Sequence, residues 1–144
     1  MSYVDALNTT LAAEHAALFV YGALGAQTSR TGTPTLYADI DAAYTEHRSR
    51  RDQLVAMIRD LGGEPVAAEP AYELPPDLST PDLVTRRALR LEKSCAATYA
   101  YLVASSPQER RRWAVTALTM TAVRELDFRG TPEIFPGGDE YADR

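Results

Sequence analysis

The sequence has a single cysteine and no long run of apolar residues. One cysteine excludes an internal disulfide, and the alanines near Cys95 predict a small, buried hydrophobic side chain. No segment approaches the length of a membrane-spanning helix, and the first residues do not follow the basic and then apolar order of a secretory signal. We therefore expect a cytoplasmic protein without a membrane segment.

An excess of positive charge is also missing, and lysine is almost absent. The 144 residues carry a formal net charge of -5, which disfavours general binding to polyanions. Of the 15 basic residues, all except Lys93 are arginine. This bias and the abundant alanine are typical of a GC-rich genome and indicate no mechanism. The length fits one domain, 1–144, with a sizeable core.

Prolines and glycines divide the chain into four predicted helices. Three segments end in a serine or threonine followed by proline, so a capping acceptor precedes a residue that needs no donor. These pairs are Thr33-Pro34, Thr80-Pro81 and Ser106-Pro107. Glycines, which favour the left-handed conformation at helix ends, supply the stops. We expect helices at about 3–29, 34–61, 81–105 and 107–129, with an irregular tail at 130–144.

Residues 62–80 are rich in proline and show no helical periodicity. An extended chain of this length could reach about 60 Å, whereas a helix of 25 residues is only about 38 Å long. The segment can therefore cross the whole bundle, while the short links after the first and third helices make those neighbours antiparallel. An all-α bundle of four helices with one long crossover between the second and third is the ferritin-like arrangement.

Polar side chains interrupt the apolar stripe of each predicted helix. The first helix contributes an acid, the second a histidine and an arginine, the third an acid at the flank of its stripe, and the fourth an arginine and an acid. These residues are Glu14, His47, Arg51, Glu92, Arg124 and Asp127. An isolated ion inside a bundle is strongly disfavoured, so we expect such groups to be paired with one another or with a ligand.

The polar residues match only part of a di-iron site. Ferritin-like di-iron bundles use one glutamate from each of two helices and a Glu-x-x-His unit from each of the other two. Glu14 and Glu92 match the lone glutamates, and His47 matches the histidine of the second helix. Tyr44 stands where the glutamate of that unit belongs, Glu46 is expected on another face, and the fourth helix has no histidine. We predict no catalytic residues from this set.

Arginine side chains could fill the space that metal ions occupy in such bundles. The charges of Glu14 and Glu92 would be balanced by Arg51 and Arg124, with His47 as an adjustable donor or acceptor. We therefore predict a buried network that sets helix register and needs no cofactor. Its members are Glu14, Tyr44, His47, Arg51, Glu92 and Arg124. The alternative is a site for Fe, Mn or Zn formed by Glu14, His47 and Glu92, because three such ligands plus water can hold one transition metal.

Several short strings sharpen the resemblance to known proteins. They are Ala13-Glu14-His15-Ala16, Glu46-His47-Arg48-Ser49-Arg50-Arg51-Asp52, Tyr72-Glu73-Leu74-Pro75, Leu91-Glu92 and Phe135-Pro136-Gly137. In these strings the chain resembles an actinobacterial, alanine-rich ferritin-like family that is known as a domain of unknown function. The likeness extends from about residue 5 to residue 138. It implies a ferritin-like fold and no established activity.

Tyrosines, the second histidine and the tail have simpler interpretations. Tyrosines at helical spacing could line a small cavity, but they are more often core residues with a bonded hydroxyl. This group comprises Tyr21, Tyr44, Tyr99 and Tyr101. His15 is expected to be a packing or surface residue. Ile134 and Phe135 are expected to fold back on a bundle end or to reach a neighbouring subunit.

Possible partners follow from the charge pattern and the fold. Arginine clusters at 48–51, 86–90 and 110–112 could suggest nucleic acid, but the last two should lie at opposite ends of the bundle. They form no continuous stripe, so nucleic-acid binding is not expected. Small bundles often present an apolar face to a two-fold partner, which predicts a homodimer. We expect a binding or structural protein, with a metal-binding protein or metal-dependent oxidoreductase as the alternative.

Overall fold

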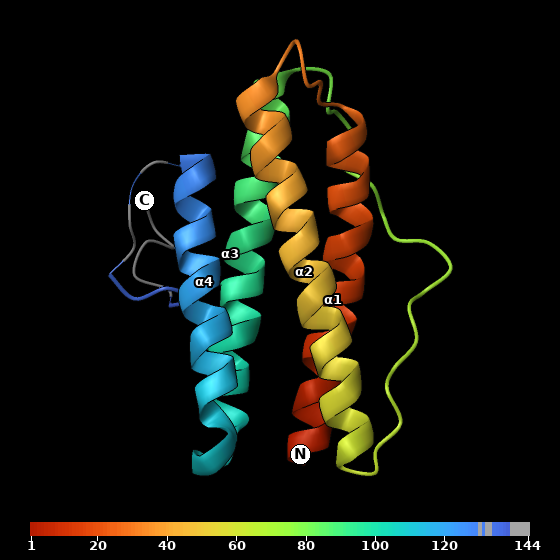
Figure 1. Cartoon of the computed structure of the whole chain (residues 1–144), viewed down its shortest axis with the longest axis vertical. Helices are drawn as coiled ribbons and strands as arrows, with labels where there is room; N and C mark the ends of the chain where they lie inside the picture. Colours follow the sequence, from red (N-terminus) through yellow and green to blue (C-terminus); the bar gives the residue numbers. More distant parts are fainter. Residues whose placement is uncertain (130, 132–133, 139–144) are drawn as a thin grey trace.

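The computed structural model describes residues 1–129, 131 and 134–138. Four long helices run side by side in it (Figure 1). They are α1 (Tyr3–Ala26), α2 (Pro34–Asp60), α3 (Pro81–Ser105) and α4 (Arg111–Arg129), with a 3-10 turn, η1 (Gln108–Arg110), before α4. The predicted all-α bundle of four helices is confirmed, and none of the described helices is both long and apolar enough to cross a membrane.

Helix ends lie close to the predicted positions where a cap is formed. Ser2 caps α1 in a capping box with Asp5, and the Thr80 hydroxyl accepts from the Leu83 amide at 3.2 Å at the start of α3. The fourth helix begins later than predicted. The Ser106 hydroxyl donates to the Leu102 carbonyl of α3 at 2.6 Å, so it does not cap the following helix, which opens with η1.

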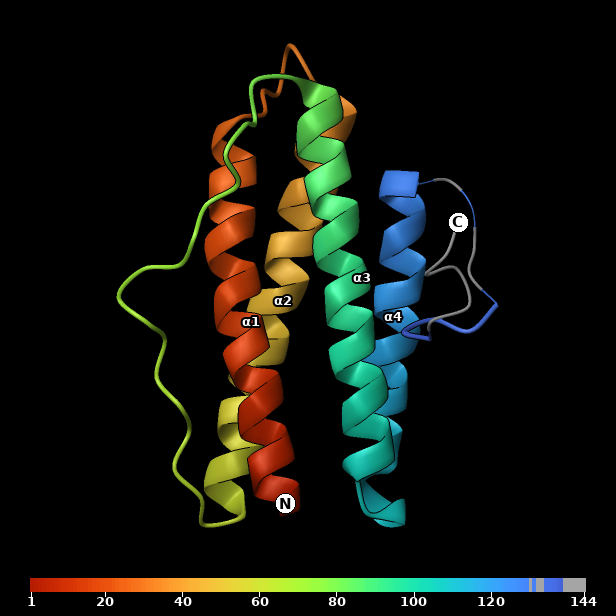
Figure 2. The same ribbon diagram turned by 180° about the vertical axis from the view of Figure 1, so that it is seen from behind.

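The crossover at residues 61–80 runs the length of the bundle beside α1 (Figures 1 and 2). The Asn8 side chain holds its first part, donating to the Glu64 carbonyl at 3.0 Å and accepting from the Val66 amide at 2.8 Å. His15 Nε2 donates to the Val66 carbonyl at 3.0 Å. Since α2 and α3 therefore start at the same end, α1 and α2 are antiparallel, as are α3 and α4.

The core consists of two apolar clusters separated by a polar layer. One cluster surrounds Tyr21 and Leu24 near the end of α1. The other surrounds Leu11 and Leu54 toward the opposite end of the bundle. Cys95 is buried in the first cluster, as predicted, and burial raises the pKa of its thiol well above the ordinary value. The sequence positions between the clusters are those of the predicted polar network.

Only part of the tail is described, and it does not reach a bundle end. Gly137, with φ of 80°, lies against the middle of α3, where an added Cβ would be 2.6 Å from the Ala96 carbonyl oxygen. Ile134 and Phe135 are exposed rather than packed on the bundle. The other predicted tail residues, 130, 132–133 and 139–144, lie outside the described part of the chain.

Candidate functional site

Three helices place one ionisable side chain each in the polar layer. Glu14 comes from α1, His47 from α2 and Glu92 from α3, and each is at most 1% exposed. His47 Nδ1 lies 2.6 Å from Oε2 of Glu14, and His47 Nε2 lies 2.8 Å from Oε1 of Glu92. The imidazole thus bridges the two carboxylates through both of its ring nitrogens.

Two tyrosines extend this chain of hydrogen bonds at its ends. Tyr99 donates its hydroxyl to Oε1 of Glu14 at 2.6 Å, and Tyr21 donates to Oε1 of Glu92. Burial raises the pKa of both phenols well above the ordinary value, and the neighbouring carboxylates add to the shift. Both hydroxyls therefore stay protonated and act as donors, which gives the order Tyr21, Glu92, His47, Glu14, Tyr99.

The bridge determines the protonation state of His47. Burial disfavours the charged imidazolium, but the two carboxylates outweigh burial and raise the pKa of His47 to about 9. At neutral pH the ring therefore carries both protons and donates to both glutamates. Its neighbour Tyr21 stacks on it, with the ring centroids 5.3 Å apart.

A second network of charged groups joins α2 to α4. Arg50 donates to the Thr121 hydroxyl at 2.8 Å and also to Oε1 of Glu46. Arg124 donates to the other oxygen of Glu46 at 2.7 Å and to Asp127 at 2.8 Å. Because Arg50 is only 4% exposed, its pairing with Glu46 is needed to offset the cost of burying its charge.

The structure brings together three of the six predicted network residues, Glu14, His47 and Glu92. The prediction that Arg51 and Arg124 balance these glutamates is corrected. Arg51 turns outward to Asp52, and Arg124 contacts Glu46 and Asp127 instead. Tyr44 is half-buried, lies beside Arg48 and makes none of the hydrogen bonds of the polar layer.

The misplaced residues share one cause, an error of one position on α2 and α4. One residue corresponds to a rotation of about 100° around a helix. On α2 the buried residue is Arg50 rather than Arg51, and Glu46 lies at the bundle rather than on another face. On α4 the buried acid is Glu125 rather than Asp127.

Two residues of the network were assigned only a general core role by the sequence argument. Tyr21 lies seven residues after Glu14, and Tyr99 lies seven residues after Glu92. Seven residues make almost two turns, so each tyrosine shares a helix face with the glutamate before it. This repeated spacing is the signal that could have placed both hydroxyls in the layer.

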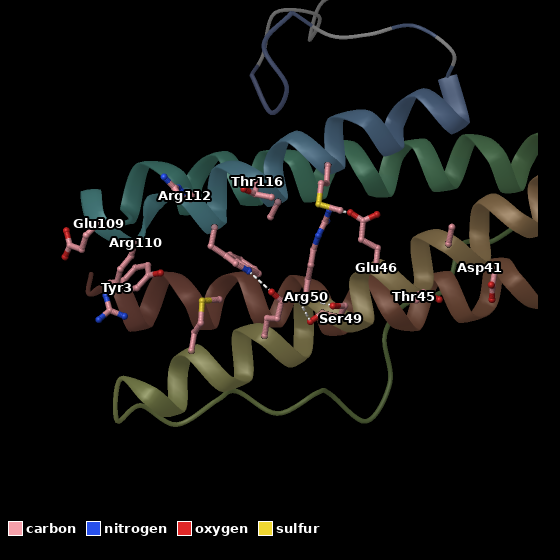
Figure 3. Close-up of a pocket in the computed structure, with 16 residues that line it drawn as sticks. Tyr3, Asp41, Thr45, Glu46, Ser49, Arg50, Glu109, Arg110, Arg112 and Thr116 are labelled. Atoms are coloured by element: carbon pink, nitrogen blue, oxygen red, sulfur yellow. Dashed lines mark hydrogen bonds and ion pairs between the residues drawn. The ribbon is translucent and has the colours of Figure 1, made fainter.

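A groove separates α2 from α4 next to the second network (Figure 3). Its volume is about 1010 Å³. Apolar side chains line much of it, and the guanidinium of Arg50 lies between them. The lining includes Tyr3, Ala42, Glu46, Met57, Arg110, Arg112, Trp113, Thr116 and Met120. The Trp113 indole donates across the groove to Gln53 at 2.9 Å.

The donor set does not fit a di-iron centre. Within the described residues no group of three or more histidine, cysteine, aspartate or glutamate side chains is arranged to hold a metal ion. Glu125 is buried on α4, but three residues later the buried side chain is Phe128, where a Glu-x-x-His unit would have histidine. His47 is the single buried histidine of the described chain, and both of its ring nitrogens face carboxylates.

Comparisons with known proteins agree with this architecture. Residues 6–140 match the model of the family described as Domain of unknown function (DUF4439). The crystal structure of a conserved hypothetical protein, rv2844, from Mycobacterium tuberculosis is similar, with a TM-score of 0.79 and 30% sequence identity. That alignment covers 88% of this chain and 87% of the mycobacterial chain.

A ferritin structure has the same fold. An engineered closed form of the Archaeoglobus fulgidus ferritin aligns with a TM-score of 0.71 and 16% identity, over 89% of this chain and 80% of that chain. The predicted ferritin-like fold is thereby confirmed, while an identity this low carries no functional conclusion. None of the curated proteins matches the chain significantly.

Proposed function

The chain belongs to the DUF4439 family of ferritin-like proteins, and from this premise we propose that it is a binding or structural protein without a di-iron centre. In this proposal the polar layer holds the helices in register. His47 supplies the positive charge between two glutamates that metal ions supply in related bundles.

One observation carries the proposal: the imidazole of His47 donates to Glu14 and to Glu92 at the same time. A ring whose pKa is raised to about 9 has no free nitrogen lone pair at neutral pH. Tyr21 and Tyr99 occupy further carboxylate lone pairs as donors. A buried network in which most members are bonded favours one arrangement of the helices.

The alternative is a metal-binding protein or metal-dependent oxidoreductase that uses Glu14, His47 and Glu92. One feature favours it. Oε2 of Glu92 is buried and has no hydrogen-bond partner among the described residues. A cation such as Fe, Mn or Zn would satisfy this oxygen, but it would also have to displace a proton from His47.

Elemental analysis separates the two functions. Protein purified without chelators is compared with Glu14→Gln, which keeps the side-chain shape and removes the charge. We expect far less than one Fe, Mn or Zn per chain in both proteins. Stoichiometric metal in the parent that disappears in Glu14→Gln would establish the alternative.

An NMR measurement tests the proposed role of His47 directly. The ring nitrogens of His47 should both carry protons at pH 7, and the spectrum should change only near pH 9. His15→Gln removes the other histidine and assigns the signals. A His47 ring with one unprotonated nitrogen at pH 7 would contradict the proposal even if no metal is found.

A further inference from the structure

The outer face of α4 is uncharged over most of its length. The eleven residues 113–123, between Arg112 and Arg124, include no charged side chain. A surface helix normally presents charged groups to water, whereas a helix that is apolar on all sides is buried. Met120 is 47% exposed and Val123 is 58% exposed. This face has the composition of a covered surface and is not covered by the described part of the chain.

Six exposed residues form a continuous stripe along this helix: Arg112, Thr116, Thr119, Met120, Val123 and Asp127. We call them the α4 stripe. Their spacing places them on one side of the helix. Three of them, Arg112, Thr116 and Met120, also line the groove between α2 and α4 (Figure 3). The two charged members lie at opposite ends, with arginine at the N-terminal end and aspartate at the C-terminal end.

The first helix shows how this chain covers an uncharged helix face. Between Asp5 and Arg30, Glu14 and His15 are the only acidic, basic or histidine residues. The crossover lies along α1 and covers it, through the hydrogen bond of His15 and the contact of Phe19 with Tyr72, whose ring centroids are 5.4 Å apart. The crossover and α4 lie at opposite sides of the bundle (Figure 1), so it does not cover the α4 stripe.

We propose that the α4 stripe is the contact surface of a homodimer, across which α4 of a second copy packs antiparallel. When the pairing is centred between Thr119 and Met120, Arg112 of each copy lies opposite Asp127 of the other copy. Thr116 then lies opposite Val123 of the second copy, so a small side chain meets a larger one. The contact is self-complementary and closes after two copies.

Charge determines the direction of this pairing. A parallel arrangement would place Arg112 opposite Arg112 and Asp127 opposite Asp127, and like charges that face each other oppose association. The antiparallel arrangement replaces both repulsions with attractions. Asp127 already accepts from Arg124 within its own chain at 2.8 Å, which holds its carboxylate at this end of the stripe.

The dimer is independent of the proposed role of the polar layer. Glu14, His47 and Glu92 are buried inside one chain, whereas the α4 stripe is exposed. Elemental analysis tests the first proposal and the oligomeric state tests the second, so that either can fail alone.

Analytical ultracentrifugation over a concentration series tests the dimer with the full chain. The parent should sediment as a dimer, and Val123→Glu should weaken association about a hundredfold, because a charge would be buried without a partner. Val66→Glu is the matched control, since Val66 is 39% exposed but lies on the crossover. It should leave association unchanged. A monomeric parent overturns the proposal, and so does a dimer that survives Val123→Glu.

A charge reversal and a crosslink test the orientation. Arg112→Glu should weaken association about tenfold, and adding Asp127→Arg should restore it. Thr119→Cys should give a disulfide-linked dimer on mild oxidation, whereas Ala12→Cys on the exposed side of α1 should not. The crosslink decides the question if Val123→Glu fails to fold. No crosslink at Thr119, or capture of a lipid or another protein in place of a second copy, would rule the dimer out.

Discussion

Tyr99 of α3 donates its hydroxyl to Glu14 of α1 at 2.6 Å, and the reciprocal bond runs from Tyr21 of α1 to Glu92 of α3. Because the two helices are antiparallel, the same Glu-x6-Tyr spacing in each one produces two equivalent contacts. His47 lies between the two glutamates and ties α2 to both helices. The layer therefore fixes the relative height of three helices with five side chains.

Removing a hydroxyl from this layer should destabilise the protein. In Tyr99→Phe the buried Oε1 of Glu14 loses its donor, so we expect the free energy of unfolding to fall by about 1–3 kcal/mol. Tyr44→Phe is the control, because Tyr44 is half-buried and outside the network. Urea denaturation followed by circular dichroism measures both changes. Equal effects of the two substitutions would show that the hydroxyl bond to Glu14 adds little.

The protonation of His47 should make stability depend on pH. The pKa of His47 is about 9 in the folded protein against 6.5 for the unperturbed group. A raised pKa stabilises the fold fully below pH 6.5, and this contribution is lost as the pH rises through 9. We expect a loss of about 3 kcal/mol across this interval. Urea denaturation at a series of pH values measures it.

His47→Gln is the control for this pH dependence. The variant keeps hydrogen-bonding capacity but cannot become charged, so its stability should be lower at neutral pH and should change little between pH 6.5 and 9. An unfolding free energy of the parent that rises over this interval would have the wrong sign for an imidazolium between two carboxylates.

Two glycines should respond in opposite directions to alanine. Gly62 follows α2 with φ of 75°, where a Cβ is strained, so Gly62→Ala should cost about 1 kcal/mol. Gly22 lies inside α1, and an added Cβ would meet nothing within 4 Å. Gly22→Ala should therefore stabilise the protein by about 0.5–1 kcal/mol. Thermal unfolding of the two variants beside the parent gives both signs, and a stabilising Gly62→Ala would contradict the conformational argument.

The fold follows from local features of the sequence. Thr80-Pro81 begins α3 as predicted, and the proline-rich segment after Gly62-Gly63 forms the long crossover. These features act within a few residues, and capping and left-handed glycine need no knowledge of the rest of the molecule. The exception is Ser106, whose hydroxyl bonds backward to α3. Sequence alone does not decide between two nearby backbone acceptors and donors of this kind.

The polar site could be predicted only in part, because burial of a given face depends on other helices. Glu14, His47 and Glu92 were found from their positions in apolar stripes. On α2, however, a spacing of three and four residues from Ile40 to Ile58 fits either Arg50 or Arg51. The choice is made by Thr121 of α4, which accepts from Arg50, and by the ring of Tyr99, whose centroid lies 5.2 Å from the guanidinium carbon.

Adjacent arginines of α2 therefore offer a direct test of the register. Arg50→Met should lower the free energy of unfolding by about 3–5 kcal/mol, because it leaves the charge of Glu46 without its nearest partner in a largely buried place. Arg51→Met should change it by less than about 0.5 kcal/mol, since Arg51 is one-third exposed and pairs only with the exposed Asp52. Guanidinium chloride denaturation of both variants measures the difference. A larger effect at Arg51 than at Arg50 would mean that α2 is rotated by one residue from the orientation described above.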